Sequence, residues 1–519
     1  MTRIDRIALL LSLVAIAAAY LVEDRVFNRM PHIEDEMAYV WQAQVLAQGK
    51  LTLPSPPDPK LMLVPFVVDY HGQRFGKYPL GWPMLLTFSL LLRARDWVNP
   101  ILAGLSLWLT YQLGKKLFDE RIALLAAFLT LSSPFFLLNS GSLLSHSWAL
   151  FLSLAFVLAW LDTFHHKDTE STKDNLVLTK KLSGIHAFVV RKPPVWLTVS
   201  VAGLSLGVLA MTRPLTAVGV GLPFFIHGII LLARGDRSAR IRILTIGFVT
   251  VIVTALIPLW QFAVTGNPLL NPYTFWWPYD KVGFGPGVGS EAGGHNLYWA
   301  WFNLQSSMKA GWGDFFGWGH ISWLFLPFGA WSLGRDGRRW LMALVFPSLL
   351  LVYMAYWIGS NLFGPRYYYE GFYSVALVSA AGMFWLAEQV IRSAPMRRWM
   401  QVATVLLGVV LVGYNLIVYL PKRFNEMTDL YGISRSMLIP FETATAKSLT
   451  PALVVVHFRN SWTDYGGLLE LENADLTSPF IFALSHDRNS DLTLKKDYPA
   501  RIVIYYYSDQ PNVFYLFPK

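Results

Sequence analysis

The sequence contains no cysteine, and only 15% of its 519 residues are charged. The absence of cysteine excludes disulfides and thiolate metal sites, although it does not indicate a compartment. Soluble proteins carry about 25% charged residues, so this shortage excludes an ordinary soluble enzyme. A disordered chain is also excluded, because 54% of the residues are hydrophobic, with 21 Trp, 23 Tyr and 34 Phe among the aromatic residues.

The apolar residues are gathered in long runs. The hydrocarbon core of a bilayer is about 30 Å thick and requires a helix of about 20 apolar residues. We therefore expect an all-α polytopic membrane protein with about eleven transmembrane helices. The expected spans are 7–22, 97–114, 121–139, 143–164, 195–211, 214–233, 242–264, 318–334, 339–358, 367–391 and 399–420. The apolar stretch 80–92 is too short to span and is expected to be an interfacial or re-entrant helix.

The net charge of +10, from 43 Lys and Arg against 33 Asp and Glu, fits either a nucleic-acid surface or the positive-inside bias of a membrane protein. Every second connection between the expected spans contains two or more Lys or Arg. This set comprises 1–6, 115–121, 165–192, 234–242, 335–339 and 392–398. Such a bias predicts that these connections are cytoplasmic, and no nucleic-acid partner is expected. The long loops 23–96 and 265–317, and everything after 421, should then lie outside the inner or plasma membrane.

The two ends of the chain differ in character. Met1–Arg6, followed by an apolar run and three alanines at 17–19, resembles a signal peptide, but we favour an uncleaved first span. The tail 421–519 contains short β-branched and aromatic runs separated by turn residues. These runs are 452–458, 480–484, 501–507 and 513–517. We therefore expect a transmembrane domain over 1–420, a small β-containing exterior domain over 421–519, and a solvated linker over 165–192.

The first exterior loop begins with three consecutive acids, Glu34, Asp35 and Glu36. Apolar residues after them recur at helical spacing and predict an amphipathic helix on the membrane surface that ends near Gly49. Helix capping explains one or two acids, but three repel one another and favour a raised pKa or a cationic partner. Lys77, later in the same loop, either snorkels to the interface or holds an anion at the level of the headgroups.

The acidic pair after the first span, the surface helix and the turn Lys77-Tyr78-Pro79-Leu80 resemble those of GT-C glycosyltransferases. The resemblance is to the protein O-mannosyltransferases and the lipid A aminoarabinose transferase in particular. It includes 113–118, the stretch Gly207–Pro214 and the stretch 364–370, and it extends over residues 1–420. It implies a GT-C fold and a sugar donor linked to polyprenyl phosphate.

The resemblance also implies roles for individual residues. Asp35 corresponds to the catalytic Asp of the family and Glu36 to the acid beside it. Lys77 corresponds to the Lys that meets the donor phosphate, while Arg366, followed by Tyr367, belongs to a late Arg-Tyr motif that lines the same cavity.

One position departs from the family. The second exterior loop often carries an acid there, whereas here it offers only His146. This histidine has three possible roles. It either contacts and orients a catalytic residue without touching the substrate, binds an optional metal, or is an interfacial polar residue. No cofactor is therefore expected to be required, and a divalent metal is left open but not indicated.

Two further features are candidates for the site. Arg213 interrupts an apolar run, which marks either a functional residue or a position in the headgroup region. The loop 265–317 is rich in glycine and aromatic residues, which either anchor the protein at the interface or cover the active site. Glu291, His295 and Asp314 are its candidate contacts.

The chemistry of such a donor predicts the catalytic groups. A polyprenyl phosphate is a good leaving group, so the reaction needs a base for the acceptor hydroxyl and cations for the phosphate. We expect a glycosyltransferase that acts on a protein, lipid or polysaccharide acceptor at the exterior face, with inversion in a single displacement. The alternative is a transporter or lipid flippase, which explains the spans and Arg213 but not the long exterior loops. Transporters also usually show a repeat between their halves, and none is found.

Overall fold

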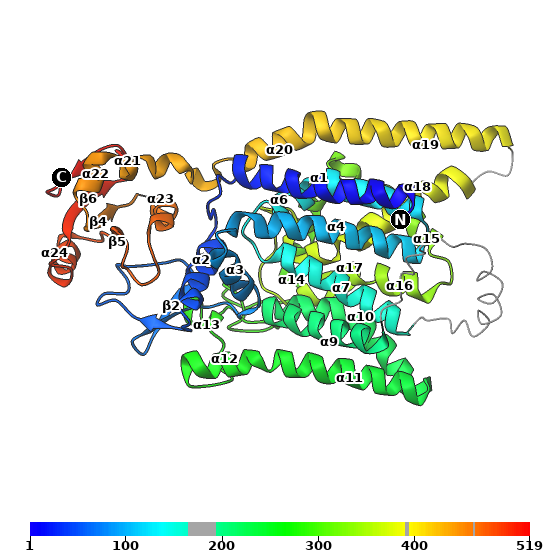
Figure 1. Cartoon of the computed structure of the whole chain (residues 1–519), viewed down its shortest axis with the longest axis horizontal. Helices are drawn as coiled ribbons and strands as arrows, with labels where there is room; N and C mark the ends of the chain where they lie inside the picture. Colours follow the sequence, from blue (N-terminus) through cyan, green and yellow to red (C-terminus); the bar gives the residue numbers. More distant parts are fainter. Residues whose placement is uncertain (165–193, 390–393, 460–461) are drawn as a thin grey trace, which may run out of the picture.

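The computed structural model describes residues 1–164, 194–389, 394–459 and 462–519. The helices form an elongated bundle, with the N-terminus near one end and a small β-sheet unit at the other (Figure 1). The predicted linker 165–192 lies outside the described residues.

Seven helical segments of the described chain are long and apolar enough to cross a membrane. They are α1 (Arg3–Arg25), α7 (His146–Phe164), α9 (Val195–Thr212), α10 (Pro214–Arg234), α11 (Arg237–Thr254) with α12 (Leu256–Thr265), η4 (Arg366–Gly371) with α18 (Phe372–Gln389), and Arg398–Glu442. The last begins inside α19 (Ala394–Tyr414) and continues through a π-helical turn, η5 (Asn415–Tyr419), into α20 (Leu420–Met427). The predicted fold class, a polytopic helical membrane protein with small sheets, is confirmed.

An eighth candidate span is bent. Helices α5 (Glu120–Ser132) and α6 (Pro134–Ser140) meet at 63°. Proline at the first position of α6 cannot donate a backbone hydrogen bond to the preceding turn. The Ser133 hydroxyl caps the new helix by accepting from the Phe136 amide at 3.1 Å. The bend turns α6 towards the interior, where it meets η4.

The predicted spans 318–334 and 339–358 are broken into shorter helices. They contain η3 (Gly319–Ile321), α15 (Leu326–Ser332), α16 (Gly337–Ala343) and α17 (Val345–Tyr353). Gly334 has a φ of 59°, a left-handed conformation that ends α15, and α17 contains Pro347 in its first turn. Helix α4 (Val98–Leu117), in contrast, runs unbroken for 20 residues over the predicted span 97–114.

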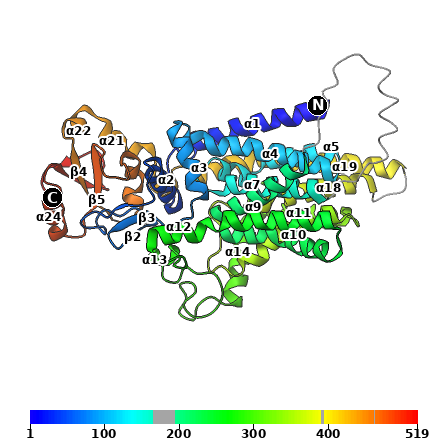
Figure 2. The same ribbon diagram turned by 60° about the horizontal axis from the view of Figure 1, so that its bottom comes forward.

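The helices differ in how deeply they lie in the bundle. The most apolar window of Arg366–Glu388 is 78% buried, whereas that of Arg237–Thr265 is only 11% buried. The segment of α11 and α12 therefore lies at the periphery, along the lower edge of the bundle in Figure 1 and turned towards the viewer in Figure 2, with its apolar side chains available to lipid. Gly203 and Gly207 of α9 allow α11 to pack closely, because a Cβ at either would lie within 2.7 Å of a valine of α11.

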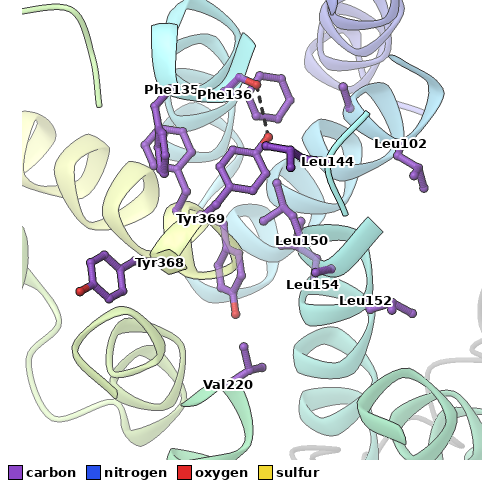
Figure 3. Close-up of a cluster of buried hydrophobic side chains, with 14 of the residues drawn as sticks. Leu102, Phe135, Phe136, Leu144, Leu150, Leu152, Leu154, Val220, Tyr368 and Tyr369 are labelled. Carbon is purple, nitrogen blue, oxygen red and sulfur yellow. Dashed lines mark hydrogen bonds between the residues drawn. The ribbon is translucent and has the colours of Figure 1, made fainter. Parts of the chain in front are cut away.

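A buried aromatic cluster fixes η4 at the centre. Figure 3 shows Tyr369 packed among Phe135, Phe136 and Leu144, with its hydroxyl directed at the Phe136 carbonyl. The hydroxyl donates to that carbonyl oxygen at 3.3 Å. Because Tyr369 is fully buried, the short helix that carries Arg366 and Glu370 is held by tertiary packing.

The first loop folds onto this end of the bundle. It contains α2 (Glu34–Ala47), β1 (Leu53–Pro54), β2 (Val67–Tyr70), β3 (Gln73–Gly76), α3 (Gly81–Leu91) and η1 (Arg95–Trp97). The strands form an antiparallel sheet in the order β1-β3-β2. Helix α3 has 11 residues, as the short apolar stretch predicts, and the Trp82 indole donates to the Leu143 carbonyl at 3.1 Å. The second long loop contains α13 (Tyr273–Trp276) and α14 (Leu297–Asp314).

The C-terminal segment forms strands where the sequence predicts them. The strands β4 (Ala452–His457), β5 (Phe480–Leu484), β6 (Ile502–Tyr507) and β7 (Phe514–Tyr515) lie in the order β5-β4-β6-β7. Central β4 is parallel to β5 and β6, while β7 is antiparallel. Around them are η6 (Leu430–Gly432), η7 (Arg435–Met437), α21 (Ile439–Glu442), α22 (Ala444–Ser448), α23 (Thr463–Gly466), η8 (Gly467–Leu471) and α24 (Arg488–Asp497).

This sheet unit docks on the first loop. Leu61 and Met62 of the loop join the hydrophobic core formed by Leu453 and Val455. Arg95 pairs with Glu470 at 2.7 Å. The same loop therefore contacts both the helical bundle and the sheet unit.

Candidate active site

A cavity of about 470 Å³ lies between α2, the 77–79 turn, the junction of α9 and α10, α12 and the loop after it. Its charged lining consists of Glu34, Asp35, Lys77, Arg213, Asp280 and Arg366, and its tyrosines are Tyr39, Tyr78, Tyr273, Tyr353, Tyr356 and Tyr367. Three cations and three carboxylates thus share one cavity of the size that holds a small ligand.

Asp35 faces this cavity from the first turn of α2. The Tyr78 hydroxyl donates to its Oδ1 at 2.6 Å, and Nη2 of Arg366 lies 3.5 Å from its Oδ2. The Asp35 side chain keeps 23% of its surface exposed. The structure therefore brings together Asp35 and Arg366, which are more than 300 positions apart in the sequence, as the resemblance implies.

The two acids beside Asp35 have different surroundings. Glu34 also lines the cavity, where burial, and secondarily the Asp35 charge, raise its pKa to about 7. Glu36 does not line the cavity, because its carboxylate accepts from the backbone amides of His32 at 2.7 Å, Ile33 at 3.3 Å and Leu143 at 2.8 Å. Burial raises the pKa of Glu36 to about 7, and these amides lower it. The structure therefore does not bring Glu36 into the cavity with Asp35, because the helix directs the Glu36 side chain into the protein.

Lys77 is enclosed by aromatic rings. Its Nζ lies 3.5 Å from the centroid of Phe66, 4.9 Å from that of Trp277 and 5.1 Å from that of Tyr273, the geometry of cation–π contacts. Its Nζ also lies 3.5 Å from Oδ2 of Asp280. Burial lowers the pKa of Lys77, whereas Asp280 and Asp35 oppose this effect. Lys77 therefore belongs to the cavity.

The turn before Lys77 is seated against α2. A Cβ at Gly76 would lie 2.6 Å from the Gln42 amide oxygen, so a larger residue here would displace the Gln42 side chain. Gln42 donates its side-chain amide to the Tyr78 carbonyl at 2.9 Å, and the Lys77 amide donates to the Phe66 carbonyl at 3.1 Å. These contacts fix Lys77 relative to Asp35.

Arg213 is the third cation of the cavity. It lies at the break between α9 and α10, and its Nε is 3.3 Å from Oε1 of Glu370. Its Nη2 donates to the Tyr353 hydroxyl at 3.2 Å, and its side chain keeps 14% exposed. The interruption of the apolar run thus places a partly accessible guanidinium in the cavity.

His146 reaches the cavity only through other residues. Its Nδ1 lies 3.0 Å from Oε1 of Glu370, and both side chains are buried. Since Glu370 also pairs with Arg213, it connects the buried His146 to a cation that lines the cavity. Sequence reasoning did not assign Glu370, although this residue ends the stretch 364–370 that supports the resemblance.

The second long loop contributes a residue other than those predicted. Glu291 is exposed, His295 is hydrogen-bonded to the Met354 carbonyl at 2.9 Å, and Asp314 pairs with Arg423 at 3.0 Å. None of the three lines the cavity, so the structure does not bring them to the candidate site. Asp280 lines it instead. The one sequence feature that could have pointed to Asp280 is its position directly after the aromatic run 275–279. Trp277 of that run also lines the cavity.

Among the described residues, no group of three or more His, Cys, Asp or Glu side chains is arranged to hold a metal ion. The carboxylates of Asp35 and Asp280 instead pair with Arg366 and Lys77.

A protein-family model and several solved structures are similar to this chain. Residues 86–272 match the family described as oligosaccharyl transferase STT3, N-terminal. ArnT from Cupriavidus metallidurans bound to undecaprenyl phosphate superposes with a TM-score of 0.54 at 13% identity, over 95% of this chain and 88% of that one. The Archaeoglobus fulgidus oligosaccharyltransferase complex with Zn and sulfate gives a TM-score of 0.51 at 13% identity, over 91% of this chain and 62% of that one.

A third solved structure, the archaeal oligosaccharyltransferase AglB from Archaeoglobus fulgidus with an inhibitory peptide and a dolichol-phosphate, is 14% identical with a TM-score of 0.49. The match covers 91% of this chain but only 64% of the AglB chain. No curated protein matches the sequence. The chain has the GT-C fold of integral membrane glycosyltransferases, and the resemblance predicted from its motifs is confirmed at the level of fold.

Proposed function

We propose that the protein is a glycosyltransferase that moves a sugar from a polyprenyl-phosphate donor to an acceptor hydroxyl. The observation that carries the proposal is the arrangement of Asp35 opposite Lys77 and Arg366 in one cavity. The donor supplies its own leaving group, so the protein must supply a base and cations. Asp35 is the proposed base, and Lys77 and Arg366 are the proposed phosphate ligands.

In the donor-free cavity Asp35 is held by Tyr78 and Arg366. A donor phosphate attracts Arg366, whose planar guanidinium suits two phosphate oxygens. This leaves Oδ2 of Asp35 available for the proton of the acceptor hydroxyl. The hydroxyl oxygen then attacks the anomeric carbon, the bond to the phosphate oxygen breaks, and the electron pair leaves with the polyprenyl phosphate. A single displacement of this kind inverts the anomeric centre.

The apolar side of the cavity supports a lipid-linked donor. Ile257 and Trp260 of α12 line the cavity, whereas Leu259 and Phe262 of the same helix are 60% and 57% exposed. A polyprenyl chain crossing this helix would pass from the bilayer to the cavity without leaving an apolar surface.

The Lys and Arg bias further supports a cavity on the exterior face of the inner or plasma membrane. The proposed acceptor is a protein, lipid or polysaccharide hydroxyl, and we propose no required cofactor.

Turnover of an isotope-labelled donor tests the proposal. Purified protein in liposomes is given a polyprenyl-phosphate sugar labelled in the sugar, together with a membrane extract as the source of acceptor. A glycosyltransferase releases polyprenyl phosphate and transfers the label, whereas a flippase moves the lipid without cleaving it. Transport of intact donor without cleavage would contradict the proposal and favour the flippase. Turnover retained in EDTA is expected if no metal is required.

A further inference from the structure

Asp280 occupies an unusual position for a residue of a long loop. Its side chain is 2% exposed, and its Oδ2 is the anionic partner of Lys77 Nζ at 3.5 Å. The rings of Phe66, Tyr273 and Trp277 close around the rest of the ammonium group. The cation proposed to bind phosphate is thus already engaged with a carboxylate of the protein.

The other oxygen of Asp280 has partners of its own. Oδ1 accepts from the Tyr356 hydroxyl at 3.0 Å and from the Trp357 indole at 3.0 Å. Both donors come from the segment after α17, which is separate from the turn that carries Lys77. The carboxylate would therefore keep two hydrogen bonds if Lys77 moved away. Lys77 in turn has a flexible stem with which to move.

We propose that Asp280 is a positioning residue that stands in for the donor phosphate: it holds Lys77 in the empty cavity and exchanges it for the phosphate when the donor binds. The inference rests on the proposed function. Two anions on one buried ammonium repel each other, so phosphate binding weakens the pair between Lys77 and Asp280. Tyr356 and Trp357 stabilise the carboxylate that is left behind.

Neutralising Asp280 should change the affinity for an anionic lipid in opposite directions, depending on whether Asp280 competes with phosphate or only forms a structural ion pair. If the pair only supports the fold, removing one buried partner leaves the other uncompensated, and ligand affinity falls. If Asp280 competes with phosphate, neutralising it removes the competitor, and affinity for an anionic lipid rises. A gain in affinity is not expected from mere disruption of the site.

The test compares the affinity of the full-length protein in detergent for undecaprenyl phosphate in the wild type, Asp280→Asn and Glu291→Gln. Asp280→Asn should bind about tenfold more tightly, because one negative charge is removed beside the phosphate. Glu291→Gln removes the same charge from an exposed position of the same loop and should bind like the wild type. Equal or weaker binding by Asp280→Asn would overturn the inference but leave the proposed function standing. Absence of binding by the wild type would overturn both.

A second variant covers the case in which Asp280→Asn does not fold. Tyr356→Phe keeps the ring and removes one of the two donors to Oδ1. Asp280 then depends more on Lys77, so the affinity for undecaprenyl phosphate should fall by about threefold to tenfold. Unchanged or tighter binding by Tyr356→Phe would overturn the inference independently.

Discussion

Asp35 and Glu36 are adjacent carboxylates whose side chains have different surroundings. Asp35 has an exposed edge in the cavity, whereas Glu36 is 1% exposed and bound to three backbone amides. The partly exposed carboxylate of Asp35 suits a base that exchanges protons with substrate. The buried carboxylate of Glu36 suits a residue that joins the start of α2 to the segment at Leu143.

The first prediction separates these two roles. Asp35→Asn should lower turnover by about 10²- to 10⁴-fold, the usual loss of a general base, with the melting temperature unchanged. Glu36→Gln should keep turnover within a few-fold but destabilise the protein by about 1–3 kcal/mol, because an amide nitrogen would face backbone donors. Turnover at saturating donor and thermal unfolding in detergent are the measurements. The reverse pattern would assign the base to Glu36.

The pH dependence of stability follows from the same placement. The pKa of Glu36 is raised from its ordinary value near 4.5 to about 7 in the folded protein. Between these values the folded state holds the proton that the unfolded state has lost, so stability falls as pH rises through this range. In Glu36→Gln this part of the pH dependence should disappear.

Glu34 gives the second prediction, which concerns donor binding. Its pKa of about 7 means that the carboxyl group loses its proton as pH rises through neutrality. The new negative charge beside Asp35 should repel the donor phosphate, whose diester group does not itself titrate there. The KM for donor should therefore rise about threefold to tenfold on the alkaline side. Glu34→Gln should show a flat profile, and a profile in this variant that still rises like that of the wild type would contradict the assignment.

At the scale of elements, α3 and the end of α9 are held together by a glycine contact. A Cβ at Gly81 would lie 2.4 Å from the Thr212 hydroxyl and 2.7 Å from its backbone nitrogen. Thr212 directly precedes Arg213, and Gly81 closely follows Lys77. The spacing of these two cations in the cavity therefore depends on how closely the two helices approach.

The third prediction tests this contact. Gly81→Ala should separate the elements, destabilise the protein by about 1–3 kcal/mol through overpacking and raise the KM for donor. Gly247→Ala is a matched control, because Gly247 lies in α11 with open space where a Cβ would point, and alanine favours helix there. Thermal unfolding and donor KM are measured for both. Equal effects in the two variants would contradict the account.

Several elements were predictable because their signals are local. The acids at the start of α2, the short apolar run of α3 and the β-branched runs of the tail each predict their element from nearby residues. The broken region from η3 to α17 was not predicted, because its composition is as apolar as that of a span. Its breaks depend on a left-handed Gly334 and on packing against α18, with which α15 is in extensive contact.

At the scale of the whole molecule, the fourth prediction concerns topology. The Lys and Arg bias predicts that the C-terminus lies outside and the turn between α10 and α11 inside. Reporter fusions after Lys519 and within the turn at Gly235 should therefore report opposite sides of the membrane. The same side for both would mean that an odd number of spans has been misassigned.

Site residues were predicted where a motif of the resemblance or a charge inside an apolar run marked them. Asp35, Lys77, Arg366 and Arg213 were assigned from motifs and from the position of a charge in an apolar run. Asp280 was not, since its contact with Lys77 joins positions more than 200 residues apart through a loop without regular structure. A long-range pairing of this kind leaves no periodic signal in a single sequence.

The measurement that tests the central claim most directly is a structure of the protein with undecaprenyl phosphate bound. The account predicts the phosphate in the cavity, within hydrogen-bonding distance of Lys77 Nζ and the guanidinium of Arg366, with Asp35 facing the same space and the polyprenyl chain leaving along α12. A phosphate bound outside the cavity, or in it but away from both cations, would contradict the account.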